Sequence, residues 1–381
     1  MTTSIEELLG LQPPTANCKK ESKNQISFSL LFFSDVRKDV TDKQKYEFVR
    51  DITVFGDRAG FTAIYIPERH FYEFGSIFAN SAVMASYLIP QTTRIRFRTA
   101  GISLPLHHPA EIVEWWAMND ILSGGRVDLG FGSGWNKPDF IYAPAEYAER
   151  RKICSEWIPL VQKLWRGETV AFPGPDGELI PIVVYPRPLQ KELNVWLLIT
   201  KNDHGFFYAG RQGYNVFTML YGNNFEAMRE KIALYRQGRK EGGHDPKEGI
   251  VTLMLHTLVH ESRDLVHKVV ESPFKAYIKS SLDAHVQALD ERGVTNEGVS
   301  AKEKAKILDY AYQRYVKTAA IFGTVDDGRK VIDEAIAIGV NDIACLVDFG
   351  VDYSLVKESL SYLEQLISHY SNSQGGQDIN R

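Results

Sequence analysis

Short apolar runs alternate with longer amphipathic segments along most of the chain. The first run, ISFSLLFFS (26–34), has the length of a strand, and the segment after it (42–61) places apolar residues at helical spacing and closes on Gly60. A second apolar run, FTAIYI (61–66), follows directly. Repetition of a strand and a helix in this order predicts parallel strands that are covered by helices.

The alternation continues to residue 370. Further helices are expected at about 78–88, 110–122, 145–165, 203–212, 225–243, 325–339 and 353–370. Further strands are expected in RIRFRTAGISLPL, RVDLGFG, NVWLLIT, YNVFTML, GIVTLMLHTLV and NDIACLVDFG. Eight strands, each with a helix after it, predict an α/β fold that closes as a (β/α)8 TIM barrel, with a doubly wound open sheet as the alternative.

Two segments interrupt the alternation and are expected to be insertions. The Gly- and Pro-rich stretch VAFPGPDGELIPIVVYP (170–186), after strand 4, predicts a hairpin, whereas residues 261–320, after strand 7, are mostly helical and charged. Residues 1–24 lack periodicity and are expected to be a flexible leader, and residues 373–381 a disordered tail. Residues 25–372 are expected to form one barrel domain.

Composition and charge narrow the function classes. The chain has 381 residues, enough for one barrel of about 250 residues with insertions. A net charge of -4 gives no electrostatic footprint for nucleic acid, and no window of about 18 apolar residues is present for a membrane span. The start of the chain lacks a secretion signal, so a cytoplasmic location is expected. Three distant cysteines, Cys18, Cys154 and Cys345, predict neither a disulfide framework nor a zinc cluster.

Three consecutive ionisable residues, Glu68, Arg69 and His70, directly follow the second predicted strand. Three such groups in a row do not fit an apolar core because their desolvation is costly. In a (β/α)8 barrel the catalytic groups lie in the loops after the C-terminal ends of the strands. We therefore expect these side chains to point into the mouth of the barrel and to act there.

Other polar residues also stand at predicted strand ends. They include Ser103, His107 and His108 after strand 3, Thr200, Lys201 and Asn202 after strand 5, Thr218 on strand 6 and His256 on strand 7. Taken singly, a histidine at such a position is more often a structural hydrogen-bonding group than a catalyst. Asp348, at the end of strand 8, is interpreted as a cap or turn residue rather than a base.

The glycine-rich turn GFGSGW (130–135) follows strand 4. A full dinucleotide fingerprint requires a glycine at the sixth position and an acidic residue about 20 positions later, but Trp135 occupies the sixth position and a long helix follows. Small residues allow a flat ring to approach closely, and Trp135 supplies an aromatic wall. The turn therefore predicts a surface for a planar ligand, and a tight turn without a ligand is the alternative.

The sequence does not favour metal or nucleophile chemistry. A two-metal barrel hydrolase is expected to carry His-x-His at the end of strand 1, and that strand ends in FFSD. His107 and His108 are adjacent, so their side chains point to opposite faces and do not readily bind one ion. There is no GxSxG elbow, and Cys154 lies in a predicted helix without a nearby histidine. No metal site is therefore predicted.

Several longer motifs are similar to those of a known family. PERHFYEFG (67–75), the segment from PLHHP to GFGSGW (105–135), YAERRKICSEWIPLVQKLWRGE (147–168) and VTLMLHTLV (251–259) resemble the bacterial luciferase-like flavin monooxygenases. PERHF followed by FG resembles, more narrowly, the subgroup found in polyketide and nonribosomal peptide biosynthesis. The similarity extends from about residue 26 to residue 350, and LSGGRV with the glycine-rich turn is quite specific to the superfamily.

The resemblance implies a luciferase-like (β/α)8 barrel that binds reduced FMN at the strand ends and uses O2 as co-substrate. A C4a-(hydro)peroxyflavin then transfers one oxygen atom to an organic substrate, here an intermediate of natural-product biosynthesis. By this analogy Glu68 and His70 lie near the flavin ring and manage protons on the peroxide. An imidazole such as that of His70 needs little tuning to exchange protons near pH 7, and Glu68 beside it is expected to fix its tautomer.

The resemblance also implies which residues contact the cofactor and the substrate. The expected cofactor-binding residues are Ser103, Ser133, Gly134, Trp135, Arg150, Arg151, Thr200, Lys201, Asn202 and Thr218. Arg150 or Arg151 and the loop 200–202 are expected to reach the phosphate, because a polar loop that opens a helix offers free amides to an anion. The expected substrate-binding residues are Arg69, Phe71, His107 and His256.

Two departures from the subgroup pattern concern the substrate more than the cofactor. Met219 stands in FTMLYG where the subgroup usually has a histidine, and Lys201 stands where a glycine is common. Either the phosphate-binding loop is rearranged or the substrate pocket differs.

The expected partners follow from the same resemblance. The chain has no evident pyridine-nucleotide fingerprint, so a separate NAD(P)H:flavin reductase is expected to supply reduced FMN. The substrate is expected to be a small molecule or a thioester on an acidic carrier protein, which the basic and aromatic segments 275–281 and 312–317 would contact; a solvated helical face is the alternative. A homodimer is expected, because dimers are common in the superfamily. The rival functions are a deazaflavin-dependent oxidoreductase and a non-catalytic flavin-binding protein.

Overall fold

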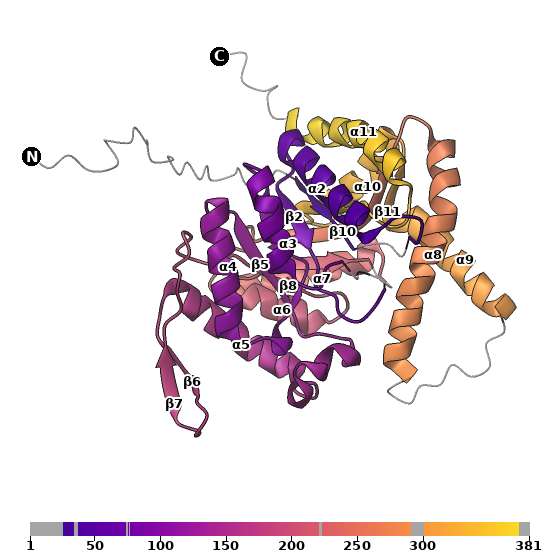
Figure 1. Cartoon of the computed structure of the whole chain (residues 1–381). Coiled ribbons are helices and arrows are strands. Elements are labelled where there is room, and N and C mark those ends of the chain that lie inside the picture. The colour runs from indigo at the N-terminus through magenta and orange to yellow at the C-terminus, as the bar shows by residue number, and fades with distance from the viewer. Residues whose placement is uncertain are drawn as a thin grey trace, which may run out of the picture.

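Eight parallel strands close into a barrel in the computed structural model of the chain, which describes residues 26–33, 37–73, 75, 77–220, 223–290 and 301–372 (Figure 1). The strands are β1 (Ser27–Leu31), β2 (Ala63–Ile66), β3 (Arg96–Thr99), β5 (Val127–Gly132), β8 (Val195–Leu198), β9 (Asn215–Met219), β10 (Val251–Val259) and β12 (Asp342–Leu346). Each pairs with its neighbours around the ring, and β1 pairs with β12 to close it. The predicted (β/α)8 barrel is therefore confirmed, and the open-sheet alternative is wrong.

Helices follow the strands and surround the barrel (Figure 1). They are α2 (Asp42–Ala59), α3 (Ser81–Leu88), α4 (Pro109–Ser123), α5 (Arg150–Arg166), α6 (Asp203–Arg211), α7 (Phe225–Glu241), α10 (Val325–Ala337) and α11 (Tyr353–Asn372), with short 3-10 helices η1 (Ile89–Gln91), η2 (Leu104–Leu106), η3 (Lys137–Ile141) and η4 (Pro144–Glu146). Thr41 forms a capping box at the start of α2, and Gly60 closes it in the left-handed conformation. The predicted helix 145–165 starts late, at Arg150, because Pro144 opens the separate turn η4.

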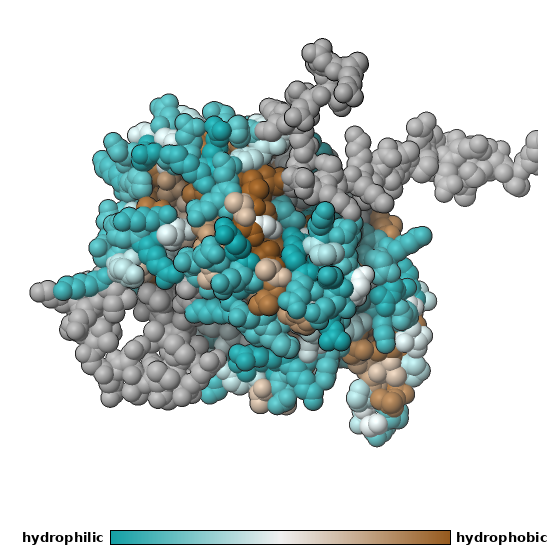
Figure 2. Space-filling view, turned by 180° about the vertical axis from the view of Figure 1, so that it is seen from behind, coloured by the Kyte–Doolittle hydropathy of each residue, from teal (hydrophilic) through white to brown (hydrophobic). Residues whose placement is uncertain are grey.

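Both predicted insertions contain the expected elements. β6 (Val170–Pro173) and β7 (Leu179–Ile182) pair antiparallel as a hairpin that projects from the barrel (Figure 1). Leu179 on this hairpin is 67% exposed, and Figure 2 shows hydrophobic residues on the projection at the lower right, apart from a second hydrophobic patch at the centre of the same face. The second insertion contains α8 (Arg263–Asp290) and α9 (Ala301–Thr318).

Two short strands lie outside the ring of eight: β4 (Ile102–Ser103) is part of the run RIRFRTAGISLPL predicted as strand 3, and β11 (Ala320–Gly323) was not predicted. β4 pairs with β5, and β11 pairs with the last four residues of β10. The first part of β10 pairs with β9 on one side and β12 on the other. β10 therefore continues beyond the ring of eight strands, and the insertion that follows it packs at the C-terminal end of the barrel.

Charged side chains fill the barrel near the N-terminal ends of its strands. Arg98 Nε donates to Asp128 Oδ2 at 2.8 Å, and an Arg98 terminal nitrogen lies 3.5 Å from Asp342 Oδ2. The Arg98 guanidinium also lies 4.4 Å from the centroid of the Trp196 ring. Both carboxylates are completely buried. A buried charge persists only when it is paired and hydrogen-bonded, so these residues act as one ion network.

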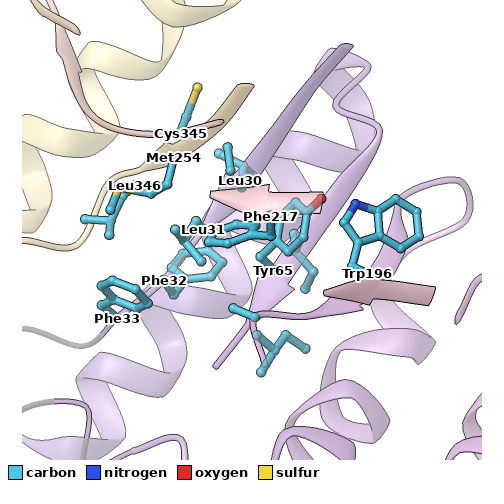
Figure 3. Packing of buried hydrophobic residues seen from close by; sticks show 14 of the residues in the cluster. Leu30, Leu31, Phe32, Phe33, Tyr65, Trp196, Phe217, Met254, Cys345 and Leu346 are labelled. Atoms are coloured by element: carbon cyan, nitrogen blue, oxygen red, sulfur yellow. The ribbon is translucent and has the colours of Figure 1, made fainter. Parts of the chain in front are cut away.

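The same layer fixes which strand positions face inward. Asp342 Oδ2 accepts from the Thr252 hydroxyl at 2.9 Å and from the Tyr65 hydroxyl at 3.2 Å. The Tyr65 ring packs 4.9 Å from the Phe217 ring, and Figure 3 shows both among the buried residues near Trp196. Because side chains of a strand alternate between its two faces, every second residue from these positions also points into the barrel.

The remaining sequence expectations concern the membrane, the cysteines and the chain ends. Among the described residues, no helix is both long and apolar enough to cross a membrane. Cys154 and Cys345 are buried free thiols. Cys18, the expected leader (1–24) and the expected tail (373–381) lie outside the described residues.

Candidate active site

The loops after β2 and β3 bring one carboxylate and two imidazoles together. Glu68 Oε1 accepts hydrogen bonds from the Nε2 atoms of His70 and His107, each at 2.9 Å. The side chains are 4%, 9% and 14% exposed, in that order. A carboxylate only accepts hydrogen bonds, so both imidazoles carry a proton on Nε2. These three residues form the Glu68 cluster, whose geometry suits the role expected for Glu68 in fixing the His70 tautomer.

The cluster is held in an ionised state. Burial would raise the pKa of Glu68, but the hydrogen bonds from His107 and His70 outweigh burial and lower it. Burial would lower the pKa of His107, but Glu68, and more weakly Glu111, raise it. Near neutral pH Glu68 is therefore a carboxylate, and His107 takes up a proton more readily than an isolated imidazole does. Such a cluster can hold a proton and return it.

The spacing of the cluster would also suit a cation. Its three ligand atoms lie within 4.8 Å of one another, and imidazole with carboxylate is a set that zinc and non-haem iron accept. The sequence indicated only the adjacent His107 and His108 as a possible ligand pair, whereas His107 contacts Glu68, which is 39 positions away. His108 lies outside the cluster, because its Nδ1 accepts from the Ala110 amide and caps α4. Direct 2.9 Å contacts within the cluster favour a proton role.

Two aromatic rings border His70. The centroid of its ring lies 5.2 Å from that of Tyr142 and 5.8 Å from that of Phe71. Phe71 is 54% exposed and has a φ of 59°, in the left-handed region that a bulky side chain rarely adopts. Backbone strain of this kind clusters at functional sites. The strained residue holds a ring beside the imidazole, where the substrate contact of Phe71 was expected.

Arg69 lies between aromatic residues from two strand ends. Its guanidinium carbon is 5.3 Å from the centroid of the Phe33 ring and 5.6 Å from that of the Trp135 ring. Burial lowers the pKa of Arg69, and the nearby Tyr277 and Asp139 oppose this effect. A guanidinium nevertheless stays protonated in proteins. Arg69 therefore places a buried positive charge against the predicted aromatic wall, within electrostatic reach of α8.

Asp139 is a site residue that the sequence analysis missed. It lies in η3, is 9% exposed and accepts a hydrogen bond from Asn136 Nδ2. Burial raises the pKa of Asp139 to about 6, against the opposing effects of Asn136, His70 and Arg69. A carboxyl group that titrates near neutral pH beside other ionisable groups is a candidate for proton transfer. The segment NKPDF (136–140) has the composition of an ordinary loop. Only the burial of Asp139 in the structure identifies it as a candidate site residue.

Replacing Asp139 by asparagine is expected to change how stability depends on pH. A raised pKa means that the folded protein favours the protonated acid, so this stabilisation is full below the ordinary pKa of 3.8 and is lost as the pH rises through about 6. The free energy of unfolding of Asp139→Asn should therefore rise, relative to the unchanged protein, between about pH 4 and about pH 7. Urea unfolding over that range measures the difference, with Asp176→Asn in the exposed hairpin turn as control. A difference independent of pH would contradict the raised pKa.

The glycine-rich turn leaves open space at the mouth. Gly132 lies four residues after Asp128 on β5, so it is on the same inward-facing side of the strand. A methyl group added at Gly132 would meet no described atom within 4 Å, whereas one at Gly134 would lie 2.9 Å from the Phe140 ring and 3.7 Å from Ser103 Cβ. Gly134 also has a φ of 73°, which favours glycine. Ser103 therefore lies close to Gly134 in the turn, and the position of Gly132 beside them is open.

Arg150 forms a hydrogen bond with this turn, whereas Arg151 points to solvent. The Nε atom of Arg150 donates to the Gly134 carbonyl at 3.2 Å, and a terminal nitrogen donates to the Tyr147 carbonyl at 2.7 Å. The next residue, Arg151, is exposed. Of the two arginines proposed for phosphate contact, the structure therefore brings Arg150 to the glycine-rich turn.

The loop from Thr200 to Asn202 leads into α6. Lys231 Nζ donates to the Lys201 carbonyl at 3.0 Å and also pairs with Asp203. Asn202 caps α6 without a side-chain hydrogen bond in the part of the chain that the structure describes. The Asn202 carbonyl accepts from the Gly205 amide, so the side chain of the cap residue leaves the amides of Asp203 and His204 unused, and the charge of Lys231 beside them is paired with Asp203.

Thr218 and Asp348, two further residues at predicted strand ends, contact neighbouring elements of the fold. Phe217 points into the barrel, so the next residue, Thr218, points outward; its hydroxyl lies 4.0 Å from Met228 Sδ on α7. Thr218 thus faces α7 rather than the barrel interior, and its cofactor contact stays a prediction. Asp348 Oδ1 accepts from the Phe33 amide at 2.7 Å, which agrees with its interpretation as a cap or turn residue.

Comparison with known proteins places these features in a family. Residues 26–342 match the model of the luciferase-like monooxygenases. The oxygenase component of a flavin-dependent trigonelline monooxygenase from Acinetobacter baylyi is 26% identical over 63% of this chain and 66% of the relative. An alkanal monooxygenase alpha chain from Photorhabdus luminescens is 24% identical over 72% of this chain and 66% of the relative. The chain thus spans just under two thirds of the length of these relatives.

Solved structures show the same fold. Monooxygenase RslO1 from Streptomyces bottropensis has a TM-score of 0.74 at 21% identity, covering 91% of this chain and 100% of that one. The oxygenating constituent of 3,6-diketocamphane monooxygenase from Pseudomonas putida, in complex with FMN, has a TM-score of 0.67 at 15% identity, covering 92% and 97%. An F420-dependent secondary alcohol dehydrogenase has a TM-score of 0.67 at 17% identity, covering 91% and 99%.

Proposed function

This chain belongs to the luciferase-like monooxygenase family, and on that premise we propose that it uses reduced FMN and O2 to oxygenate an organic substrate. The observation that carries the proposal is the open space at Gly132, at the same barrel mouth as the Glu68 cluster. The relative named as a flavin-dependent monooxygenase and the similar structure that holds FMN support this choice. The F420-dependent enzyme of the same fold makes hydride transfer the second candidate.

The residues at the mouth fit a flavin. The open position at Gly132 leaves room for the ring, and the buried Arg69 guanidinium lies over the Trp135 ring in the same turn. A phosphate group fits either Arg150 or the amides of α6 with Lys231. When bound, the reduced flavin supplies two electrons to O2, so that one oxygen atom enters the substrate and the other leaves as water.

The chain's own residues control the proton and exclude water. Glu68 keeps a proton on Nε2 of His70, which leaves Nδ1 as the atom that exchanges a proton with the reacting groups. His107 shares the same carboxylate oxygen and steadies its charge. Phe71 and Tyr142 pack around His70 and limit the access of water, which favours oxygen transfer over unproductive loss of the oxidant.

Anaerobic titration with the two reduced cofactors tests the proposal. Reduced FMN is expected to bind at least about tenfold more tightly than reduced F420, a difference of about 1.4 kcal/mol. Gly132→Leu fills the space at the turn and is expected to weaken FMN binding by about tenfold or more, whereas Gly132→Ala should have a small effect. Tighter binding of F420 would favour hydride transfer, and binding of neither cofactor would contradict both candidates.

We also propose the substrate class and the electron source that the motifs suggest. The substrate is a natural-product intermediate, free or carrier-bound, and a separate reductase delivers reduced FMN. The basis is the PERHF motif and the lack of an evident pyridine-nucleotide fingerprint in the sequence. Steady oxidation of a substrate by this protein with NADH and FMN, and without a reductase, would refute the proposal that a separate reductase delivers reduced FMN.

A further inference from the structure

A chain of hydrogen bonds joins the loop that carries His70 (67–73) to the turn η3. The Tyr72 hydroxyl donates to Asn136 Oδ1 at 3.1 Å, and Asn136 Nδ2 donates in turn to Asp139 Oδ1. Tyr72 is half-buried, whereas Asn136 and Asp139 are 2% and 9% exposed. These three residues form the Tyr72 chain. The proton control proposed for His70 uses none of them.

The residues of η3 and just after it contact the site on both sides. The ring of Phe140 lies against the glycine-rich turn, where a methyl group added at Gly134 would be 2.9 Å from it. The ring of Tyr142, which directly follows η3, lies edge-on to His70 with the ring centroids 5.2 Å apart. A shift of η3 relative to the loop 67–73 would therefore move a ring that covers His70. The Tyr72 chain links these two segments directly.

The charge of Asp139 sets the direction of the hydrogen bonds. An ionised carboxylate only accepts, so it requires the amide N–H of Asn136 and leaves the amide oxygen for the Tyr72 hydroxyl. Hydrogen bonds to an ionised group are also about twice as strong as neutral ones. A protonated carboxyl both donates and accepts, so it no longer selects one orientation of the amide. Ionisation of Asp139 therefore orders the chain, and protonation loosens it.

The charge of Asp139 changes near neutral pH. Burial raises the pKa of Asp139 to about 6, and the negative charge of Glu68 acts in the same direction. The hydrogen bond from Asn136 and the charges of His70 and Arg69 oppose this rise. The carboxyl group is therefore mostly ionised above about pH 6 and mostly protonated below it, so the chain is ordered near pH 7 and loosened in acid.

We propose that Tyr72, Asn136 and Asp139 are positioning residues that hold the loop of His70 against η3 when Asp139 is ionised. The ordered chain keeps the two aromatic rings that border His70 in place, so that water is excluded from the imidazole. Protonation of Asp139 loosens this contact and admits water. The inference deepens the proposed function, on which its effect on the reaction rests, but the Tyr72 chain itself needs no cofactor.

NMR of the full chain without FMN tests the coupling between Asp139 and Tyr72. The chemical shift of the ring carbon Cζ of a tyrosine reports the hydrogen bond of its hydroxyl, and Tyr72→Phe identifies the Tyr72 signal in protein labelled at this carbon. We expect this signal to shift with a midpoint near pH 6 in the unchanged protein and to show no such step in Asp139→Asn. A signal that does not change between about pH 4 and about pH 8, or that changes equally in Asp139→Asn, would overturn the proposal.

Release of hydrogen peroxide measures the effect on the site. Without an organic substrate, bound reduced FMN passes two electrons and two protons to O2, which leaves FMN and hydrogen peroxide, and a drier site slows this loss. Relative to the unchanged protein, Tyr72→Phe and Asp139→Asn should each release peroxide about threefold faster at about pH 7.5 and equally fast at about pH 5, where the chain is already loosened. Comparison at the same pH cancels the titration of the flavin itself. Tyr185→Phe, which removes the hydroxyl of a tyrosine that is 69% exposed, should change neither rate.

The two measurements separate this inference from the proposed function. If reduced FMN does not bind, the proposed function fails, and the Tyr72 signal still decides whether Asp139 controls the chain. If reduced FMN binds, equal peroxide release by all the proteins at about pH 7.5 would overturn the positioning role. An increase of the same size at both pH values would indicate a structural contact that does not depend on the charge of Asp139, and it would also overturn the proposal.

Discussion

Replacing His70 by alanine is expected to lower the rate of substrate oxygenation by about 10²-fold or more, while the affinity for reduced FMN stays within a few fold. A positioned acid or base typically contributes about 10² to 10⁴ in rate. The substitution removes the imidazole whose tautomer Glu68 fixes, but it leaves the glycine-rich turn and Arg150 unchanged. Single-turnover rates with reduced FMN, together with an anaerobic FMN titration, separate these two effects. Unchanged turnover would remove His70 from the mechanism.

Two controls make this result specific. His108→Asn changes a nearby histidine that caps α4 outside the Glu68 cluster, and asparagine keeps a capping side chain, so turnover should be unchanged. Glu68→Gln removes the shared negative charge and should lower the pKa of His107, which NMR titration of the imidazole can follow. Treatment with a chelator should not affect turnover of the unchanged protein. Loss of activity on chelation would instead favour a cation in the Glu68 cluster.

Replacing Arg98 by leucine is expected to lower the free energy of unfolding by about 3 to 5 kcal/mol, because one partner of a buried ion pair is removed. Arg98 bridges Asp128 and Asp342, and both carboxylates are completely buried. Arg96 still pairs with Asp128 in the variant, but Asp342 loses its nearby cation and keeps only hydrogen bonds from hydroxyl groups. Urea unfolding followed by circular dichroism measures the loss.

The loss of unfolding free energy caused by Arg98→Leu should be smaller in acid. Burial would raise the pKa of Asp128, but Arg96 and Arg98 together hold it well below its ordinary value of 3.8. A lowered carboxyl pKa stabilises the folded state above that ordinary value, and the stabilisation disappears as the pH falls through the folded pKa. The Arg98→Leu and unchanged proteins should therefore become more alike in stability below about pH 4. Arg166→Leu, which breaks a partly exposed pair with Glu168, should cost less than about 1 kcal/mol. Equal losses for the two arginines would contradict the ion network.

Much of the fold can be read from the period of the apolar positions, because helices and strands bury faces of different period. The start and end of α2 follow from the Thr41 cap and from Gly60, and both are local signals. The period of the apolar positions does not predict β11, because this strand has four residues and starts almost directly after α9, without a turn signal between them. Its strand conformation depends on pairing with β10, which is a tertiary contact.

The candidate site was predicted in part. The consecutive Glu68, Arg69 and His70 indicated the mouth, and the pairing of β2 with β3 explains why His107 reaches the same carboxylate. Strand alternation also gives the direction of Thr218, because it lies next to the inward-facing Phe217 and therefore on the other face of β9. The raised pKa of Asp139 had no counterpart in the sequence, since it results from burial in the folded protein.

The closure between β1 and β12 has a consequence during synthesis. Ser27 on β1 bonds through its hydroxyl to Asp342 on β12, and these residues are 315 positions apart. At about 5 to 20 residues per second, a ribosome needs roughly 15 to 60 s to make the intervening chain. Throughout that time the first strand has one edge without its final neighbour. The nascent barrel therefore stays open on the ribosome until its last strand emerges, and an exposed β1 edge is a natural target for chaperones.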